Sequence, residues 1–203
     1  DLERLRRALK YERMSLWGGS FGTRIAQHYI RKYGAHVRAA VLDGVTPVSE
    51  SIFVTGPVTG QRALDLLFTD CERDAACAGA FPHLREHLDA LLSRGERGEL
   101  RFEVGDPRSG FERSGMIDRD GVVGLVRGAR YVSMTRALAP YAIARGASGD
   151  VKPLLALGAA TAEWSVDTMS LGSMLGIICG EDLARAKTQD PASLSFGFMR
   201  DSY

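Results

Sequence analysis

The residue whose type and setting best support chemistry is Ser20. It lies in the middle of Gly18-Gly19-Ser20-Phe21-Gly22 and follows the apolar run Met14-Ser15-Leu16-Trp17. This pattern predicts a short buried strand, a tight glycine-rich turn with the serine at its apex, and then a helix. A serine held in such a strained turn projects its Oγ atom from the sheet, where it can act as a nucleophile. Gly18 and Gly22 lack the Cβ atoms that would collide where strand and helix pass closely.

The residue after the serine supplies a second chemical group. The backbone N–H of Phe21 lies in the first turn of the predicted helix, where it can donate to an oxyanion with help from the helix dipole. A G-x-S-x-G turn between strand and helix is typical of the nucleophile elbow of α/β-hydrolases. An ordinary Gly-Ser turn is the alternative. A phosphate-binding loop is disfavoured, because the sequence has neither its lysine nor a ribose-binding acid.

A serine nucleophile needs a base, and none of the histidines suits this role. His28 would lie about 12 Å further along the helix that follows Ser20. In α/β-hydrolases the acid and then the histidine follow the serine in the chain, and no histidine follows His87. We therefore expect the base outside this chain. Asp43, at the end of the next predicted strand, is an alternative acid, although an Asp-Gly turn before Gly44 explains it more simply.

The elements that must position Ser20 occupy residues 1–47. A helix over residues 1–10 carries Leu2, Leu5 and Leu9 as a sheet-covering stripe. A strand at 14–18, a helix at 21–33 and a strand at 37–43 form a βαβ unit with parallel pairing. Two strands do not make a stable open sheet, so we expect partner strands outside the chain. Together with the abrupt ends of the sequence, this favours a fragment.

Residues 48–203 are expected to form a mostly helical lid over the elbow. Such insertions shape the substrate pocket and exclude water. A hairpin is predicted around Leu100–Val104 and the turn-rich 105–110. Two helices are predicted over 61–73 and 83–93 from their apolar spacing. Three more are predicted from their N-terminal caps: one capped by Asp118 or Asp120 and ending near 130, one capped by Ser133 and ending at 145, and one capped by Asp150 and ending near 164. The expected fold class is α/β, part of an α/β-hydrolase parallel sheet with a large helical lid.

The composition limits the partners. The 203 residues carry a formal net charge of +1, so no basic surface for nucleic acid is indicated. No apolar stretch is long enough for a membrane span. We expect no cofactor and no metal, and the oligomeric state stays open.

The sequence resembles one branch of the α/β-hydrolases. Residues 15–23 and 40–45 are similar to the elbow region of enzymes related to tripeptidyl aminopeptidase and prolyl iminopeptidase. Cys71 and Cys77 followed by Phe81-Pro82, and Ile178-Cys179-Gly180-Glu181-Asp182, resemble the lid of the former. The resemblance implies a secreted or envelope-associated bacterial exopeptidase that releases short peptides or amino acids from peptide N-termini through an acyl-enzyme on Ser20. It also implies that the acid and histidine lie outside this chain, which alone would be inactive.

Three questions stay open at this point. Glu181 and Asp182 could bind the substrate α-ammonium, or could simply start a solvated helix. Cys71 and Cys77 could form a disulfide or remain two buried thiols, with Cys179 left over and buried. An esterase or a non-catalytic binding module on the same fold is the alternative to the peptidase.

Overall fold

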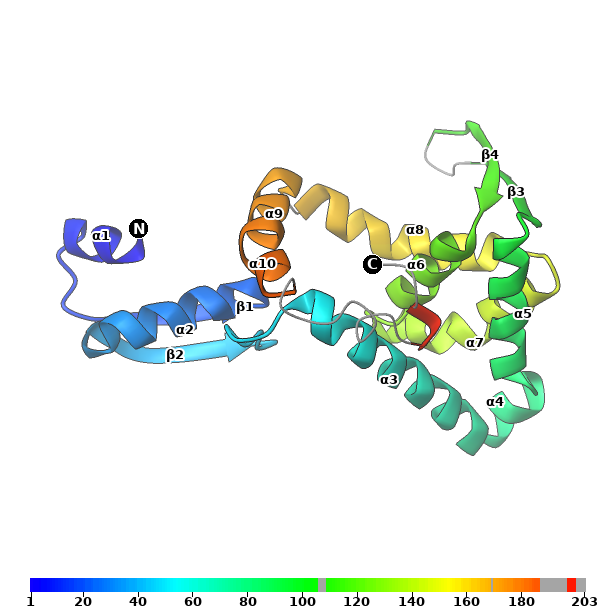
Figure 1. Ribbon diagram of the computed structural model, residues 1–203, viewed down its shortest axis with the longest axis horizontal. Helices are drawn as coiled ribbons and strands as arrows, with labels where there is room; N and C mark the ends of the chain where they lie inside the picture. The colour runs from blue at the N-terminus through cyan, green and yellow to red at the C-terminus, as the bar shows by residue number, and fades with distance from the viewer. Residues whose placement is uncertain (106–108, 169, 187–196, 200–203) are drawn as a thin grey trace. The chain divides into compact units, whose positions relative to one another are not determined.

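The computed structural model describes residues 1–105, 109–168, 170–186 and 197–199 (Figure 1). The chain forms two compact units, Asp1–Ile52 and Phe53–Tyr203. Within the described residues it is a mixed α/β protein with two small sheets of two strands each. The large parallel sheet of a complete α/β-hydrolase is not present in this part of the chain.

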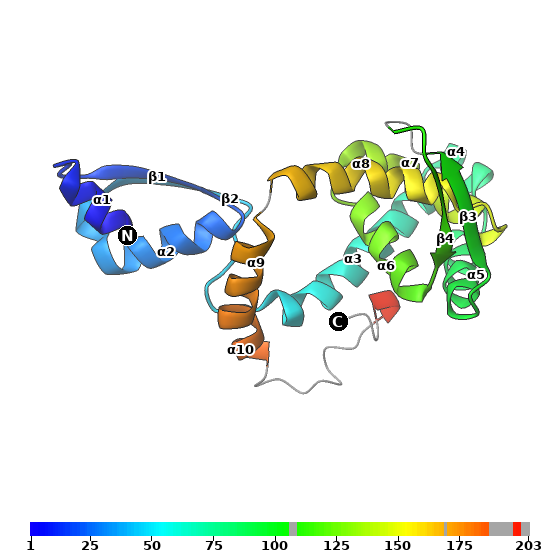
Figure 2. The same cartoon turned by 90° about the horizontal axis from the view of Figure 1, so that it is seen from above.

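The first unit is a βαβ arrangement preceded by a helix. Figures 1 and 2 both show α2 running along the β1–β2 pair. The strands are parallel, and their register runs from Met14 opposite Val37 to Gly19 opposite Asp43. The predicted strand, helix and strand are therefore confirmed. Their bounds are α1 Leu2–Ala8, β1 Met14–Gly19, α2 Phe21–Tyr33, a 3₁₀ turn Gly34–His36 and β2 Val37–Asp43.

The buried face of α1 differs from the predicted leucine stripe. Leu5 and Leu9 are each 54% exposed, whereas Glu3 and Arg6 are buried. The Glu3 carboxylate accepts hydrogen bonds from Arg6 Nη2 at 2.8 Å and from the Tyr29 hydroxyl of α2 at 2.8 Å. Because these polar groups satisfy one another, they can occupy the interface between the two helices. Burial of Leu5 and Leu9 is therefore absent within the described residues, and their contact with further strands stays a prediction.

The sheet of the first unit leaves apolar side chains in solvent. Trp17 of β1 is 81% exposed and Val41 of β2 is 59% exposed. The burial expected for these strands is therefore absent within the described residues. Pairing with further strands stays a prediction.

The second unit is mostly helical. Its core is a continuous cluster of buried side chains from α3, α5, α6, α7 and α8, with Leu64, Leu91 and Ile143 among them. The β3–β4 hairpin is antiparallel, as predicted. The elements are α3 Ile52–Arg73, α4 Ala75–Ala80, α5 Leu84–Glu96, β3 Leu100–Gly105, β4 Glu112–Ile117, α6 Arg119–Ala129, α7 Ser133–Ala147, α8 Lys152–Thr168, α9 Leu171–Ile177, a π-helical turn Ile178–Asp182, α10 Leu183–Ala186 and a 3₁₀ turn Gly197–Met199.

Several details of the second unit correct or refine the predictions. Asp118 caps α6 by accepting from the Gly121 N–H at 2.8 Å. Ser133 is the first residue of α7 and not its cap. Cys71 and Cys77 form a disulfide with their Cα atoms 5.1 Å apart, which resolves that alternative. Cys179 is an exposed free thiol, so the expectation of a buried cysteine was wrong.

Candidate active site

Ser20 has the backbone conformation that the elbow requires. It is the single residue between the end of β1 and the start of α2, with φ 49° and ψ −118°. Positive φ is unfavourable for a residue with a Cβ atom, and such strain persists only where the surrounding structure enforces it. Ser20 is exposed, so its hydroxyl-bearing side chain is accessible at the turn.

The strand and the helix lie very close together at Gly18. A Cβ atom at this position would lie 2.5 Å from the Gly22 carbonyl oxygen and 2.9 Å from the Thr23 nitrogen. No neighbouring atom lies within 4 Å of a Cβ built on Gly22 itself. Glycine is thus required at position 18, as predicted, while the steric reason given for Gly22 was wrong. Only a side chain at position 18 would collide, because the backbone of Gly22 faces the strand and a Cβ atom on Gly22 would point away from it.

Hydrogen bonds hold the turn from both sides. The Ser20 N–H donates to the Asp43 carbonyl oxygen at 2.8 Å, which extends the β1–β2 pairing to the serine. The Ser20 carbonyl oxygen accepts from the Thr23 N–H at 3.0 Å and from Thr23 Oγ1 at 2.6 Å. Thr23 is fully buried. These bonds supply the constraint that keeps Ser20 in its strained conformation.

Three residues that support the turn, Thr23, Gln27 and Thr46, were not singled out from the sequence. Thr23 Oγ1 also accepts from the Thr46 N–H at 2.9 Å, on the chain that leaves β2. Gln27 Nε2 bridges the Thr23 and Thr46 carbonyl oxygens at 3.1 and 3.0 Å. The sequence did contain a signal for the role of Thr23. This threonine lies three residues after Ser20 in the first turn of the helix, and Ser and Thr hydroxyls commonly bond to nearby backbone groups.

The Phe21 amide lies at the N-terminus of α2, directly after Ser20. Phe21 is the first residue of α2, and the first N–H groups of a helix have no intrahelical acceptor. The positive end of the helix dipole lies at the same point. A negatively charged oxygen next to Ser20 would therefore meet a donor and a favourable potential.

Asp43 lies at the same edge of the sheet as Ser20. It is the last residue of β2, is opposite Gly19 in the register and is exposed. Gly44 follows with φ 63°, so the Asp-Gly pair forms the turn that its sequence predicts. The structure thus brings the Asp43 backbone to Ser20 and leaves its carboxylate in solvent.

Neither histidine of the first unit lies close to Ser20. His28 is an exposed residue of α2, eight positions beyond the serine and about 12 Å along the helix. His36 precedes β2, and its Nδ1 lies 3.3 Å from the Glu12 carbonyl oxygen. It is therefore at the opposite end of the sheet, roughly 23 Å from the Ser20 end for strands of this length. Neither histidine of Asp1–Ile52 is therefore placed to accept the Ser20 proton, and a base outside this unit stays a prediction.

The acidic pair at 181 and 182 belongs to the second unit. Both residues lie in the π-helical turn that joins α9 to α10, so neither starts a helix. Asp182 is only 3% exposed, and Glu181 is half-buried. The interpretation as a solvated helix start was therefore wrong. Binding of a substrate ammonium by this pair stays a prediction, although π-helical turns are frequent at functional sites.

A charged network fixes the helices of the first unit. Hydrogen bonds from Arg6 and Arg7 hold the pKa of the Glu3 carboxyl well below its usual range, against the opposing effect of burial. The bond to Glu3 in turn raises the pKa of Arg6. Burial, followed by the bond to Glu3, raises the pKa of the Tyr29 hydroxyl. Glu3 is thus ionised and connects α1 to α2, the helix that positions Ser20.

Comparisons with protein-family models, with curated proteins and with solved structures found no match. Among the described residues, no cluster of histidine, cysteine or acidic side chains is arranged to hold a metal ion. No helix in that same part of the chain has the length and apolar character needed to cross a membrane.

Proposed function

We propose that this chain carries the nucleophile of a serine hydrolase of the α/β-hydrolase type, and that Ser20 is that nucleophile. The observation that carries the proposal is the strained, exposed conformation of Ser20 at the turn between a parallel strand and a helix. The backbone contact of Gly18 with Gly22 and the hydrogen bonds of Thr23 enforce this conformation. Strain maintained at an exposed, reactive side chain is a feature of catalytic sites.

The proposed reaction proceeds through an acyl-enzyme. Ser20 Oγ attacks the carbonyl carbon of the substrate while a general base accepts the hydroxyl proton. The carbonyl oxygen becomes an oxyanion that accepts a hydrogen bond from the Phe21 N–H. The intermediate then expels the leaving group, which receives the proton, and water hydrolyses the acyl-enzyme to restore Ser20. The base comes from outside Asp1–Ile52, and Asp43 is the alternative acid.

The substrate class proposed is the N-terminal end of a peptide. Support comes from the resemblance of residues 15–23 and 40–45 to exopeptidases, and from the acidic pair Glu181 and Asp182, whose charge suits an α-ammonium. The Cys71–Cys77 disulfide supports a secreted or envelope location, because disulfides persist in oxidising compartments. The second unit would then serve as the lid.

Hydrolysis by the natural protein that contains this chain tests the proposal. We expect turnover of an aminoacyl anilide, loss of turnover on N-acetylation, and a loss of about 10³-fold or more in Ser20→Ala. Ser15→Ala, an exposed serine of the same strand, is the matched control and should retain activity. Equal turnover of free and acetylated substrates would favour the esterase. Full activity of Ser20→Ala would contradict the proposed nucleophile.

A further inference from the structure

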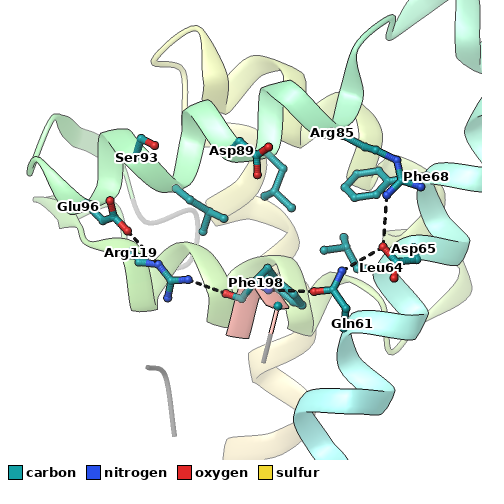
Figure 3. A pocket seen from close by; sticks show the side chains of 13 residues that line it. Gln61, Leu64, Asp65, Phe68, Arg85, Asp89, Ser93, Glu96, Arg119 and Phe198 are labelled. Carbon is teal, nitrogen blue, oxygen red and sulfur yellow. Dashed lines mark hydrogen bonds and ion pairs between the residues drawn. The ribbon is translucent and has the colours of Figure 1, made fainter. Parts of the chain in front are cut away.

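A groove in the second unit lies between α3 and α5, beside the 3₁₀ turn Gly197–Met199 (Figure 3). The described residues leave a cavity of about 810 Å³ there, a size typical of ligand sites. Its floor is apolar and includes Leu64, Leu88 and Leu92. The groove therefore offers the shape and the apolar surface that a bound ligand needs.

One wall of the groove already holds a piece of peptide chain. The Phe198 side chain is 7% exposed and packs into the hydrophobic core. Its N–H donates to Gln61 Oε1 at 2.9 Å, and its carbonyl oxygen accepts from Arg119 Nη2 at 3.1 Å (Figure 3). The Arg130 guanidinium lies 5.1 Å from the ring centroid. Side chains thus bind both backbone groups of Phe198, while its aromatic ring is buried in the core.

The Gln61 amide is oriented for this contact. Its Nε2 donates to Asp65 Oδ1 at 3.0 Å, which leaves Oε1 to accept from the Phe198 N–H. Arg119 is likewise fixed by an ion pair with Glu96 at 3.2 Å. Both groups that contact the Phe198 backbone are therefore held by neighbours on the protein.

The charge of the groove favours a cationic ligand. The groove is lined by three carboxylates and by only two guanidinium groups; these belong to Asp65, Asp89 and Glu96 and to Arg85 and Arg119. Arg85 pairs with Asp65 at 3.3 Å, and Arg119 pairs with Glu96. In the part of the chain that the structure describes, no hydrogen bond or ion pair reaches the Asp89 carboxylate. A basic group bound along α5 would gain this partner.

We propose that this groove is a peptide-binding site that recognises an aromatic residue followed closely by a basic one. The ring enters the pocket now filled by Phe198, Gln61 and Arg119 bind the peptide backbone, and the basic group reaches Asp89. The Gly197–Phe198 turn is the resident occupant and competes with an incoming peptide. The chain's own sequence, Gly197-Phe198-Met199-Arg200, has the required composition. This site is separate from the proposed chemistry at Ser20 and does not depend on it.

Displacing the resident turn tests the proposal. A Cβ atom on Gly197 would collide with Gln61 Oε1, and the residue has φ +59°. Gly197→Ala should therefore disfavour the resident turn, both through the left-handed backbone at position 197 and through the collision with the Gln61 side chain. Gly124→Ala in α6 is the matched control, because no atom lies within 4 Å of the added methyl group. Phe198→Ala is a second variant that vacates the aromatic pocket directly.

The measurement is fluorescence anisotropy of a labelled Gly-Phe-Met-Arg peptide with the full chain. We expect Gly197→Ala and Phe198→Ala to bind it at least about tenfold more tightly than the wild type and Gly124→Ala, a difference of about 1.4 kcal/mol. Gly-Ala-Met-Arg should bind at least about tenfold more weakly than the parent peptide. Adding Asp89→Asn should remove the preference for Gly-Phe-Met-Arg over Gly-Phe-Met-Gln.

Two results would overturn the proposal. The first is equal binding of Gly-Phe-Met-Arg to the wild type and to both displacing variants. The second is the absence of saturable binding up to about 1 mM when circular dichroism shows a folded Gly197→Ala or Phe198→Ala chain. Neither result bears on the reactivity of Ser20, so failure here is distinguishable from failure of the hydrolase proposal.

Discussion

The Gly18 Cα and the Gly22 carbonyl group are so close that one added methyl group cannot fit between them. A Cβ atom on Gly18 would lie 2.5 Å from that oxygen and 2.6 Å from its carbon. Both are backbone atoms, so no side-chain rotation can relieve the collision. The position of α2 against β1, and with it the turn at Ser20, depends on glycine at position 18.

Gly18→Ala should therefore destabilise the first unit. We expect a loss of about 1–3 kcal/mol in the free energy of unfolding, the usual cost of forcing an extra methyl group into a packed site. Gly19→Ala is the control, since no atom lies within 4 Å of its added Cβ, and should change stability by less than about 0.5 kcal/mol. Urea denaturation followed by far-ultraviolet circular dichroism measures both. Equal stability of the two variants would contradict the close contact.

Thr23→Val should weaken the support beneath Ser20. Valine keeps the shape of threonine but removes the Oγ1 atom that joins the Ser20 carbonyl group to the Thr46 N–H. A buried donor without its acceptor costs about 1–3 kcal/mol. Thr23→Ser keeps the hydroxyl and should cost about 0.8 kcal/mol for the lost methyl group. Thermal denaturation compares the two, and a Thr23→Val chain as stable as Thr23→Ser would refute this role.

Acid should weaken the junction of α1 and α2 through Glu3. The hydrogen bonds from Arg6 and Arg7 lower the pKa of this carboxyl from its ordinary value of 4.5. Because the folded pKa lies below the unfolded one, the contribution of Glu3 is fully present above about pH 4.5 and is lost as the pH falls through the folded pKa. The ion pair then loses its negative partner.

Glu3→Gln tests this pH dependence. The variant should be less stable than the wild type near neutral pH, and the difference should narrow as the pH falls below about 4.5. Urea unfolding midpoints at a series of pH values give the comparison. Glu12→Gln, which replaces an exposed acid, should follow the wild type throughout. Parallel curves for the wild type and Glu3→Gln would show that Glu3 carries no such contribution.

The Cys71–Cys77 disulfide should stabilise the second unit. The cross-link closes a short loop of sequence separation 6 between α3 and α4. Chain entropy predicts that its loss costs about 2 kcal/mol for a loop of this size. The double variant Cys71→Ser/Cys77→Ser should have a lower unfolding temperature than the wild type, and dithiothreitol should lower the unfolding temperature of the wild type by a similar amount. Cys179→Ser should have no effect, and an equal melting temperature of the double variant and the wild type would contradict this prediction.

The elements around Ser20 follow from the sequence because their signals are local. Apolar strand residues, the glycine turn and Gly34 after α2 place each boundary within a residue or two. The buried pair Glu3 and Arg6 could not be predicted in the same way. Its burial depends on the Tyr29 hydroxyl of another helix, and periodicity in α1 alone favours the leucines.

The second unit shows the same limit. The predicted helices over 83–93 and 133–145 form, because their apolar residues meet in one core. Helix α3 begins at Ile52 and continues through Pro57, whereas the sequence favoured a start near Gln61. Glycine and proline disfavour a helix interior locally, and packing of the buried Pro57 overrides that preference. The contact of Phe198 with Gln61 spans 137 positions, which no local pattern could indicate.

Covalent labelling with a fluorophosphonate probe tests the nucleophile most directly. Applied to the natural protein that contains this chain, with peptide mapping by mass spectrometry, it should place the adduct on Ser20. Labelling should disappear in Ser20→Ala and persist in Ser15→Ala. An adduct on another residue, or no adduct on a folded and otherwise intact protein, would contradict Ser20 as the reactive serine.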